Sequence, residues 1–357
     1  MESFLAFMSS MLLFGGLRRL RTKQLPLDSI QEMDICLNPC QQVRMSCNFV
    51  CALSKSVFID VTAVEIVASE LAKTDMRTFI EGVRWDADDW HFAADAKESG
   101  PLTCQYIFVL DCLNFCFWPV EGLEYDYLAR SLKEVLIRDL KSFDADVLAN
   151  MTEKRLQHWF SKYQLPMLSE RVMRLRELGA VLKDRYDGLA CNVVFASGNS
   201  AVQLVRILIE NIPGFRDTAM YDGHFIHLYK RAQILVGDVW AAYGRPVDGH
   251  KYYLTGIEQL TTFPDYRIPQ LLRAFGILTY SKELSNLVDS KKELDFSSTD
   301  EVEIRASTVV AVDMLHAVLM AKGLSLTVVE LDWLLWQKGE LAKERIKPHH
   351  RTRTIFY

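Results

Sequence analysis

The chain has 357 residues, half of them apolar, with 41 basic and 46 acidic side chains and a formal net charge of −5. This length and apolar content predict a sizeable core, in one large domain or two medium ones. The net negative charge argues against a protein that grips a long polyanion, but it does not exclude a small phosphate-bearing ligand held by a few cations.

Residues 1–36 differ in character from the rest of the chain. An apolar run over residues 4–16 is followed by a basic cluster, Arg18, Arg19, Arg21 and Lys23. The run is too short to span a bilayer, and a signal peptide would carry its basic residues before the apolar stretch. An interfacial helix is one interpretation. We prefer a weakly ordered extension, followed by a single helical domain over residues 37–357.

The eight cysteines include two pairs with i, i+4 spacing, Cys36/Cys40 and Cys47/Cys51. Structural zinc sites usually have more closely spaced pairs, so free intracellular thiols are the default and metal binding is the alternative. We therefore expect a cytoplasmic protein with no metal and no cofactor.

The first helical signal is Thr62-x-x-Glu65, which reads as a capping box in front of an apolar stripe, Val64, Val67, Ala68 and Leu71. An acidic and aromatic segment, residues 85–91, ends in His91. A single histidine in such a segment is more often a structural hydrogen-bonding group than a ligand contact.

Residues 106–118 form the most apolar run of the body. Periodicity does not decide between a buried strand and a buried helix here. Asp111 and Asn114 are its strongly polar members, and a buried carboxylate has to be paired, hydrogen-bonded or neutralised. Asp111 therefore belongs either to a well-satisfied core or to a pocket.

Residues 124–190 read as successive amphipathic helices, and the next helix starts at Asn199-Ser200 and breaks at Pro213-Gly214. A further helical face follows over residues 229–240. Lys230 and Arg231 fall in its first turn, where the helix dipole disfavours cations. The pair indicates either a partner anion or a solvated helix end.

Residues 262–270 form a turn with two prolines that carries Asp265 between Pro264 and Tyr266. The apolar positions that follow predict a helix ended by Gly276. Asp265 should therefore sit just before a helix N-terminus. From spacing alone a helix cap is the simpler interpretation, and a functional carboxylate is the alternative.

Two further features lie near the C-terminus. A helix over residues 302–320 carries Glu303 and Arg305 near its start. In residues 328–337, Asp332 lies among large apolar side chains, with Trp333 and Trp336 one turn apart, so we expect the acid beside an aromatic wall. The basic tail, residues 347–357, is expected on the surface.

Five of these segments together resemble the queuosine salvage family, the queuosine 5′-phosphate N-glycosylase/hydrolases. The matching blocks are residues 108–118, 229–236, 263–270, 301–305 and 331–336. The resemblance runs from about Asn38 to the C-terminus and implies an all-α fold, mainly helical and distantly similar to DNA glycosylases, with room for a few short strands. It also implies a monomeric hydrolase that releases the base queuine from queuosine 5′-phosphate for reuse in tRNA. A small molecule is then the partner, with no direct nucleic-acid or membrane contact.

The resemblance also implies roles for individual residues. Asp265 corresponds to the catalytic carboxylate, and Asp332 and Trp333 to a late acid–aromatic pair. His91 corresponds to a base-contacting histidine in a poorly matching local context, and Gln337 stands where family members carry a second acid, which puts one polar contact in doubt. The implied substrate-binding residues are His91, Asp111, Asn114, Phe115, Lys230, Arg231, Pro264, Tyr266, Arg267, Asp332, Trp333 and Gln337.

The residue types suit this chemistry. Breaking an N-glycosidic bond develops positive charge on the ribose, and a fixed carboxylate can stabilise that cation or trap it covalently. Queuine carries a secondary ammonium and a diol on its side arm, for which Asp332 and Trp333 are suitable partners. The phosphate would need cations, and Lys230, Arg231, Arg267 and Arg305 are the supply.

Two other classes of protein stay open. A helical DNA glycosylase would share the fold and the aspartate, but it would show a continuous basic stripe on its surface. A non-enzymatic helical binding protein would leave Asp265, Asp332 and Lys230 scattered. The sequence does not decide between nucleoside and nucleotide substrates, or between a covalent and a purely electrostatic role for Asp265.

Overall fold

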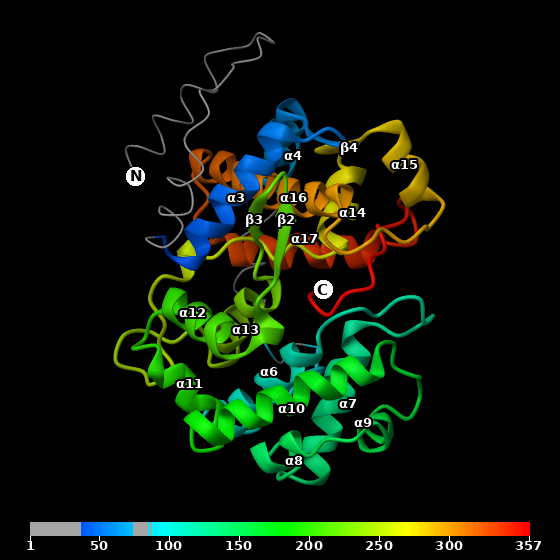
Figure 1. The fold of residues 1–357 in the computed structure, drawn as a ribbon. Coiled ribbons are helices and arrows are strands. Elements are labelled where there is room, and N and C mark those ends of the chain that lie inside the picture. Colours follow the sequence, from blue (N-terminus) through cyan, green and yellow to red (C-terminus); the bar gives the residue numbers. More distant parts are fainter. Residues whose placement is uncertain (1–36, 74–84, 86–87) are drawn as a thin grey trace. The chain divides into compact units, whose positions relative to one another are not determined.

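The computed structural model describes residues 37–73, 85 and 88–357, and these residues are mainly helical with a few short strands, as predicted (Figure 1). The first helices are α3 (Pro39–Leu53), α4 (Val61–Leu71), α6 (Pro101–Leu113), α7 (Tyr125–Arg138), α8 (Ala145–Ala149), α9 (Glu153–Trp159), α10 (Leu168–Arg185), α11 (Ala190–Ala196) and α12 (Ala201–Asn211). The later ones are η1 (Pro213–Phe215), α13 (Lys230–Ala242), η2 (Ile257–Gln259), α14 (Arg267–Ala274), α15 (Lys282–Asp289), α16 (Thr299–Ala321) and α17 (Val328–Ala342). The proposed N-terminal extension lies outside the described residues.

The strands form two small antiparallel pairs. β1 (Val57–Ile59) pairs with β4 (Leu278–Tyr280), so that Val57 lies opposite Tyr280. β2 (Thr218–Tyr221) and β3 (His224–His227) form a hairpin. Its two turn residues, Asp222 and Gly223, have φ of 48° and 79°, as an Asp-Gly hairpin turn requires.

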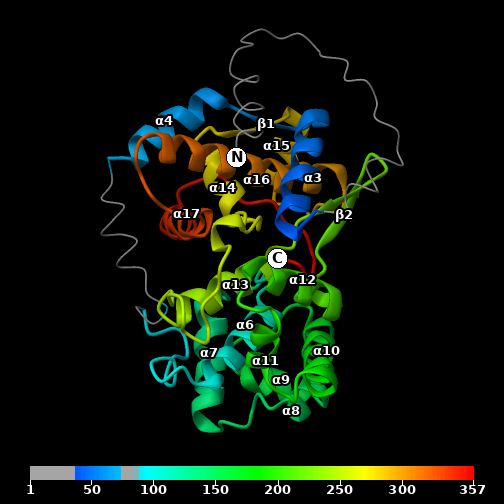
Figure 2. The same cartoon turned by 90° about the vertical axis from the view of Figure 1, so that its left-hand side faces the viewer.

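The two ends of residues 38–357 pack together. Figures 1 and 2 show α3 and α4, in blue, beside α14 to α17, in yellow to red, whereas the middle of the chain, α6 to α12, forms the opposite half. Helix α13 packs on α6 and on α12, and the Tyr229 hydroxyl just before it donates to Gln42 on α3 at 3.4 Å. Side chains from both halves can therefore meet beside α13.

Helix α16 is the central element of the first group. It is long and apolar enough to cross a membrane by length and composition, but 56% of its most apolar window is buried inside the fold. It packs against α3, α4, α14 and α17. Burial on several sides accounts for its apolar composition, because a helix that is hydrophobic all round fits a core as well as a bilayer.

The apolar run of residues 106–118 is resolved as a helix that ends at Leu113, followed by an irregular segment. Two buried arginines bind the carbonyl oxygens at this end. Arg171 donates to the carbonyls of Leu113, Phe115 and Cys116, and Arg231 donates to those of Asp111 and Cys112 at 2.9 and 2.8 Å. The last carbonyls of a helix lack partners within the helix, so these cations fix where the chain leaves α6.

Helix α12 starts after Ser200, as predicted, and the Ser200 side chain caps it by accepting from the Gln203 N–H. The cap of α4 is Asp60, which accepts from the Ala63 N–H, so the capping box expected at Thr62 and Glu65 was wrong. The prediction that the C-terminal tail lies on the surface was wrong in part, because three of its residues are buried: His350, Thr352 and Tyr357, at 2%, 1% and 2% exposure. The Arg305 guanidinium lies 4.2 Å from the centre of the Tyr357 ring, and the Tyr357 carbonyl accepts from the Cys116 N–H at 2.9 Å. The basic composition of the tail does not reveal these contacts.

The cysteine pairs lie largely on α3. Cys40 and Cys47 are buried there, and the Cys51 thiol lies 3.6 Å from the Ser307 hydroxyl. Cys36 lies outside the described residues. Burial raises the pKa of Cys40 to about 12 and that of Cys51 to about 11, so both thiols stay protonated at neutral pH.

Candidate active site

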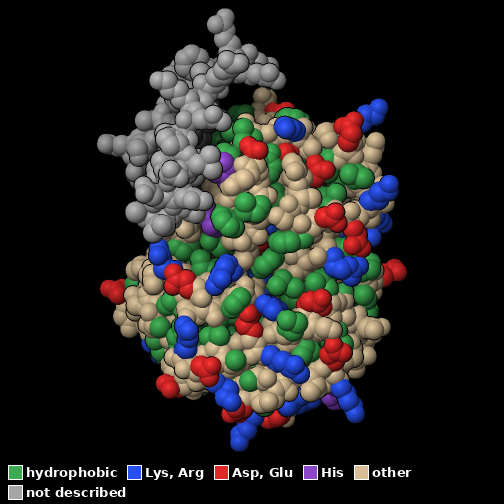
Figure 3. Space-filling model, in the orientation of Figure 1, with side chains coloured by type: hydrophobic (Ala, Val, Ile, Leu, Met, Phe, Trp, Pro, Cys, Tyr) green, Lys and Arg blue, Asp and Glu red, His purple; other side chains and the backbone are tan. Residues whose placement is uncertain are grey.

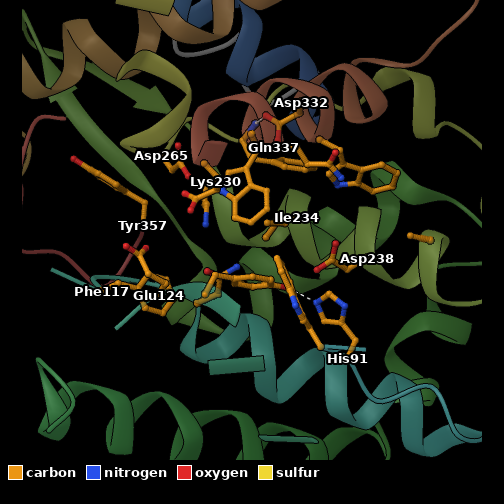
Figure 4. Close-up of a pocket in the computed structure, with 18 of the residues that line it drawn as sticks. His91, Phe117, Glu124, Lys230, Ile234, Asp238, Asp265, Asp332, Gln337 and Tyr357 are labelled. Carbon is orange, nitrogen blue, oxygen red and sulfur yellow. Dashed lines mark hydrogen bonds between the residues drawn. The ribbon is translucent and has the colours of Figure 1, made fainter. Parts of the chain in front are cut away.

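A cavity of about 460 Å³ lies where α13, α17 and the Asp265 turn meet (Figure 4). Its lining contains eight of the residues singled out from the sequence: His91, Asn114, Lys230, Asp265, Tyr266, Asp332, Trp333 and Gln337. These residues come from segments far apart in the chain, so the fold brings together what the sequence left dispersed. A pocket of this size with a few convergent polar groups is a candidate ligand site.

Asp265 caps a helix and faces the cavity at the same time. Its Oδ1 accepts hydrogen bonds from the backbone N–H groups of Arg267, at 2.7 Å, and Ile268, at 3.0 Å, at the start of α14. Its Oδ2 accepts no hydrogen bond from the described residues. Burial raises the pKa of Asp265, and the nearby Lys230 ammonium opposes that shift. The two interpretations of Asp265 are therefore compatible, because each uses a different oxygen.

Lys230 is the one lysine or arginine among the described residues that line the cavity. It is 4% exposed, and its backbone N–H donates to Asp217 Oδ2 at 3.1 Å, which fixes the start of α13. No described residue accepts a hydrogen bond from its ammonium. Burial lowers the pKa of Lys230, whereas Asp265 and Asp111 raise it. Its charge is thus directed at the cavity.

Asp332 lies on the first turns of α17, and the start of the Asp265 turn holds it. The Thr262 hydroxyl and the Phe263 N–H, the latter at 2.8 Å, both donate to its Oδ1. Burial raises the pKa of Asp332 to about 7, although these two hydrogen bonds oppose the shift. Figure 4 shows Asp332 above Lys230, with Asp265 to one side. The second oxygen of Asp332 is the one that can bind a ligand.

His91 is held by both ring nitrogens. Nδ1 lies 2.7 Å from the Trp85 carbonyl oxygen, and Nε2 lies 2.9 Å from the Tyr125 hydroxyl. Burial lowers the pKa of His91 to about 4, so the ring is neutral at neutral pH. Because a carbonyl only accepts, Nδ1 carries the proton and Nε2 accepts from Tyr125. The ring also stacks on Trp85 at 3.9 Å between centroids. It therefore forms part of the cavity wall without contributing charge.

Five of the predicted binding residues lie behind the cavity wall. Asp111 is completely buried and accepts a hydrogen bond from Asn114 Nδ2 at 3.2 Å, and Arg231 binds the end of α6. The Phe115 ring lies between the Arg171 and Arg231 guanidinium groups, at 4.3 and 5.1 Å.

The other two belong to the Asp265 turn. The Pro264 carbonyl accepts from Arg305 Nε at 2.9 Å, and Arg267 Nε donates to Glu340 at 2.6 Å. Arg305 itself is fully buried against Asp217 and Glu301. Of the four cations expected to supply the phosphate site, three are therefore engaged in protein contacts, and Lys230 remains.

Other lining residues were not predicted. Asp238 was missed, although it lies two turns after Lys230 on α13, and a carboxylate within the apolar pattern of that helix was the available signal. Tyr357 was missed because the tail was expected on the surface. Trp336, expected in an aromatic wall beside Asp332, lines the cavity with that residue. Five aromatic residues of the wall were also missed: Trp85, Trp90, Phe117, Tyr125 and Phe263. Only spatial proximity unites them, so periodicity along the chain did not reveal the group.

The arrangement bears on the two alternative classes of protein. Asp265, Asp332 and Lys230 line one cavity, whereas a binding protein unrelated to this chemistry was expected to leave them scattered. On the face shown in Figure 3, Lys and Arg side chains are interspersed with Asp and Glu over the described residues. A stripe suited to tracking a nucleic-acid backbone is a different pattern.

Comparisons with known proteins identify the family of this chain. The profile of the family described as queuosine salvage protein matches residues 93–357, so His91 lies just outside the match. A protein of Dictyostelium discoideum named queuosine 5′-phosphate N-glycosylase/hydrolase is 41% identical over 329 residues, covering 90% of this chain and all of the relative. Proteins with the same name from Sphaerobacter thermophilus and Bos taurus are 37% and 32% identical, covering 85% and 91% of this chain and 94% and 100% of the relatives. The chain therefore belongs to the queuosine salvage protein family.

Proposed function

We propose that this protein hydrolyses the N-glycosidic bond of queuosine 5′-phosphate and releases queuine for reuse in tRNA. The observation that carries the proposal is the placement of Asp265. Two backbone N–H groups fix one of its oxygens, and the other accepts no hydrogen bond from the described residues, in a cavity that Lys230 and Asp332 also line. The names of the relatives supply the substrate.

The proposed chemistry uses Asp265 against the ribose. As the bond between the anomeric carbon and the base nitrogen breaks, its electron pair leaves with the base and positive charge develops on the sugar. A preorganised carboxylate stabilises this cation, and water then adds to the anomeric carbon. The proton that this water loses balances the one that the base nitrogen takes up, which gives ribose 5-phosphate and neutral queuine. Asp265 either stabilises the charge throughout or forms a transient bond to that carbon.

The leaving base places a particular demand on the site. A 7-deazapurine has carbon in place of N7, so the leaving base cannot be protonated at that atom, as a purine usually is. More of the barrier must be lowered by stabilising the sugar cation and by hydrogen bonds to the base edge. Two acids that line the cavity, Asp265 and Asp332, favour a cationic transition state when they are ionised.

The phosphate is assigned to Lys230. It is the one lysine or arginine in the described lining, and it lies in the first turn of α13. The 5′-phosphate would then lie near Asp265. The substrate requires this, because one ribose links the phosphate to the anomeric carbon that Asp265 faces. We infer a preference for the nucleotide over the nucleoside from this placement.

The direct test is incubation of the purified protein with queuosine 5′-phosphate and, in parallel, with unphosphorylated queuosine, with free queuine followed by mass spectrometry. We expect queuine from both, and faster from the nucleotide. Release no faster than in a protein-free control, for both substrates, would contradict the proposed function.

Two further properties belong to the proposal. A small-molecule substrate enclosed in a cavity needs no second subunit, so we propose a monomer, to be checked by light scattering at several concentrations. We also propose a cytoplasmic location, where reduced thiols persist, to be checked by fractionating the source cells.

A further inference from the structure

The face of α13 that lines the cavity carries a basic side chain at one end and an acidic side chain at the other. Lys230, Ile234 and Asp238 follow one another at i, i+4 and i+8, and all three line the cavity. Two helical turns separate the first from the last, about 12 Å along the helix axis. In the view of Figure 4, Lys230 and Asp265 lie towards the left and Asp238 and His91 towards the right. The cavity therefore has a distinct acidic end.

The carboxyl at this end lacks a donor. Asp238 is 6% exposed, and its Oδ2 is buried without a hydrogen-bond partner among the described residues. The side chain of Asp111 lies within hydrogen-bonding reach of Asp238. Asp111 is fully buried, and its Oδ2 also lacks a partner among the described residues. A carboxylate oxygen only accepts, so two such oxygens satisfy each other only when a proton lies between them.

The electrostatics of this carboxyl pair agree with its geometry. Burial raises the pKa of Asp238, and the neighbouring Asp111 raises it further. Burial also raises the pKa of Asp111, against a hydrogen bond from Asn114 and the charges of Lys230 and Arg231. Two carboxyls this close do not ionise together, so in the empty cavity the pair retains a proton that a cation could replace.

Aromatic rings surround the acidic end. The Trp85 and His91 rings stack, the His91 and Tyr125 centroids lie 5.8 Å apart, and Trp336 packs edge-on against Tyr125 at 5.9 Å and against Trp90 at 6.4 Å. His91 is neutral, so it does not compete as a counter-ion for Asp238. A buried acid beside several aromatic faces is an environment that attracts an alkylated ammonium group.

We propose that Asp238, supported by Asp111, binds the secondary ammonium of the substrate's side arm. The inference rests on the proposed function and adds the residue that distinguishes queuine from the same base without its arm. The ammonium donates to the Asp238 carboxylate, and the proton that the two carboxyls shared leaves to solvent. The cyclopentene ring of the arm then packs on the aromatic wall.

Asp332 is the competing choice for the ammonium, because it also lines the cavity. Its Oδ1 already accepts from Thr262 and Phe263, and its charge interacts with those of Asp265 and Lys230. Those two residues are assigned to the ribose and the phosphate. The arm leaves the base on the side away from the ribose. It therefore reaches towards the end of the α13 face where Asp238 lines the cavity.

The test compares two substrates in matched variants. Queuosine 5′-phosphate has the arm, and 7-deazaguanosine 5′-phosphate has the same ring system without it. The measured quantity is the ratio of their kcat/KM values in the wild type, Asp238→Asn, Asp332→Asn and Asp88→Asn. Asp88 is an exposed acid on the cavity rim, so its variant removes one negative charge without touching the proposed subsite.

We expect Asp238→Asn to lower the ratio by about ten- to a hundredfold, the size of a lost charge-assisted hydrogen bond. Asp88→Asn should change it less than about threefold, since a rim charge acts through solvent. An equal loss on both substrates in Asp238→Asn overturns the proposal, and so does a fall in the ratio in Asp332→Asn alone. Asn at 238 can donate to Asp111, so the variant should fold, which a thermal melt checks.

A binding measurement separates this proposal from the proposed function. Calorimetric titration with free queuine and with 7-deazaguanine needs no turnover. The wild type should bind queuine more tightly, and Asp238→Asn should lose most of that preference. A wild type that binds queuine preferentially but hydrolyses nothing would leave the subsite supported and the hydrolase rejected. Equal affinity of the wild type for both bases would reject the subsite.

Discussion

Arg305 and Asp217 form a buried ion pair that holds both sides of the active site. Two hydrogen bonds join them, at 3.0 and 2.6 Å, and both side chains are essentially unexposed. Arg305 Nε also holds the carbonyl of Pro264, the residue before Asp265, and Asp217 accepts from the Lys230 N–H. The carboxylate turn and the lysine helix are thus fixed relative to each other through one pair of residues.

The first prediction concerns this ion pair. Arg305→Met leaves Asp217 and Glu301 buried without their cation, and it should lower the free energy of unfolding by about 3–5 kcal/mol. Asp217→Asn should cost less, because Arg305 keeps Glu301 as a partner. Chemical denaturation measures the loss. Arg138→Met, at an exposed ion pair on α7, is the control and should change stability little. Single variants as stable as this control would show that the pair does not hold the site.

The second prediction separates the two functions of Asp265. Asp265→Asn keeps an oxygen for the N–H groups of Arg267 and Ile268 but removes the charge, so stability should change little while single-turnover cleavage slows by at least about a hundredfold. Asp265→Ala removes both and should also cost about 1 kcal/mol of stability. Substrate binding should survive in Asp265→Asn. A fully active Asp265→Asn enzyme would remove the catalytic role.

The third prediction concerns the phosphate. Lys230→Ala should lower kcat/KM for queuosine 5′-phosphate by about ten- to a hundredfold, the size of a lost charge-assisted contact. Lys230 also helps to keep Asp265 ionised, so cleavage of the unphosphorylated nucleoside should fall too, but less. The control is Lys343→Ala. Lys343 is a nearby cation that does not line the cavity, and it pairs with Glu124 and Glu340. Equal losses on both substrates would show that Lys230 does not bind the phosphate.

The fourth prediction concerns pH and stability. Burial raises the pKa of Asp332 to about 7, above its ordinary value, so the folded state keeps a proton that the unfolded chain has already lost. Stability should therefore fall as pH rises from about 4 to about 7, by up to about 1.4 kcal/mol per pH unit for this one group. The pKa values of Asp111, Asp238 and Asp265 are raised as well, so the useful quantity is the difference between variants.

In Asp332→Asn, the slope of stability against pH should be shallower than in the wild type over that window, and the two slopes should agree above it. Urea denaturation at a series of pH values measures both. Asp295→Asn, at an exposed acid, is the control and should keep the wild-type slope. Identical slopes in Asp332→Asn and the wild type would show that Asp332 is ionised throughout.

Local features of the chain could be predicted from sequence where the controlling contacts are local. Asp265 lies two and three residues before the N–H groups that it binds, so the spacing alone predicted the cap. The helix that follows has an apolar periodicity of the ordinary kind, and Ser200 caps α12 within three residues. The family resemblance rests on blocks of residues in a fixed order, and these can be recognised in the sequence without knowledge of the fold.

Tertiary structure alone decided which polar residues face the cavity. Lys230 and Arg231 are adjacent, basic and buried, yet of the two only Lys230 lines the cavity. Arg231 instead binds carbonyls more than a hundred residues away, at the end of α6. Successive residues on a helix point in different directions, and which direction is the cavity depends on the elements packed around it. The pairing of Asp238 with Asp111, and the burial of Tyr357, depend on such distant contacts too, which no periodicity in the chain encodes.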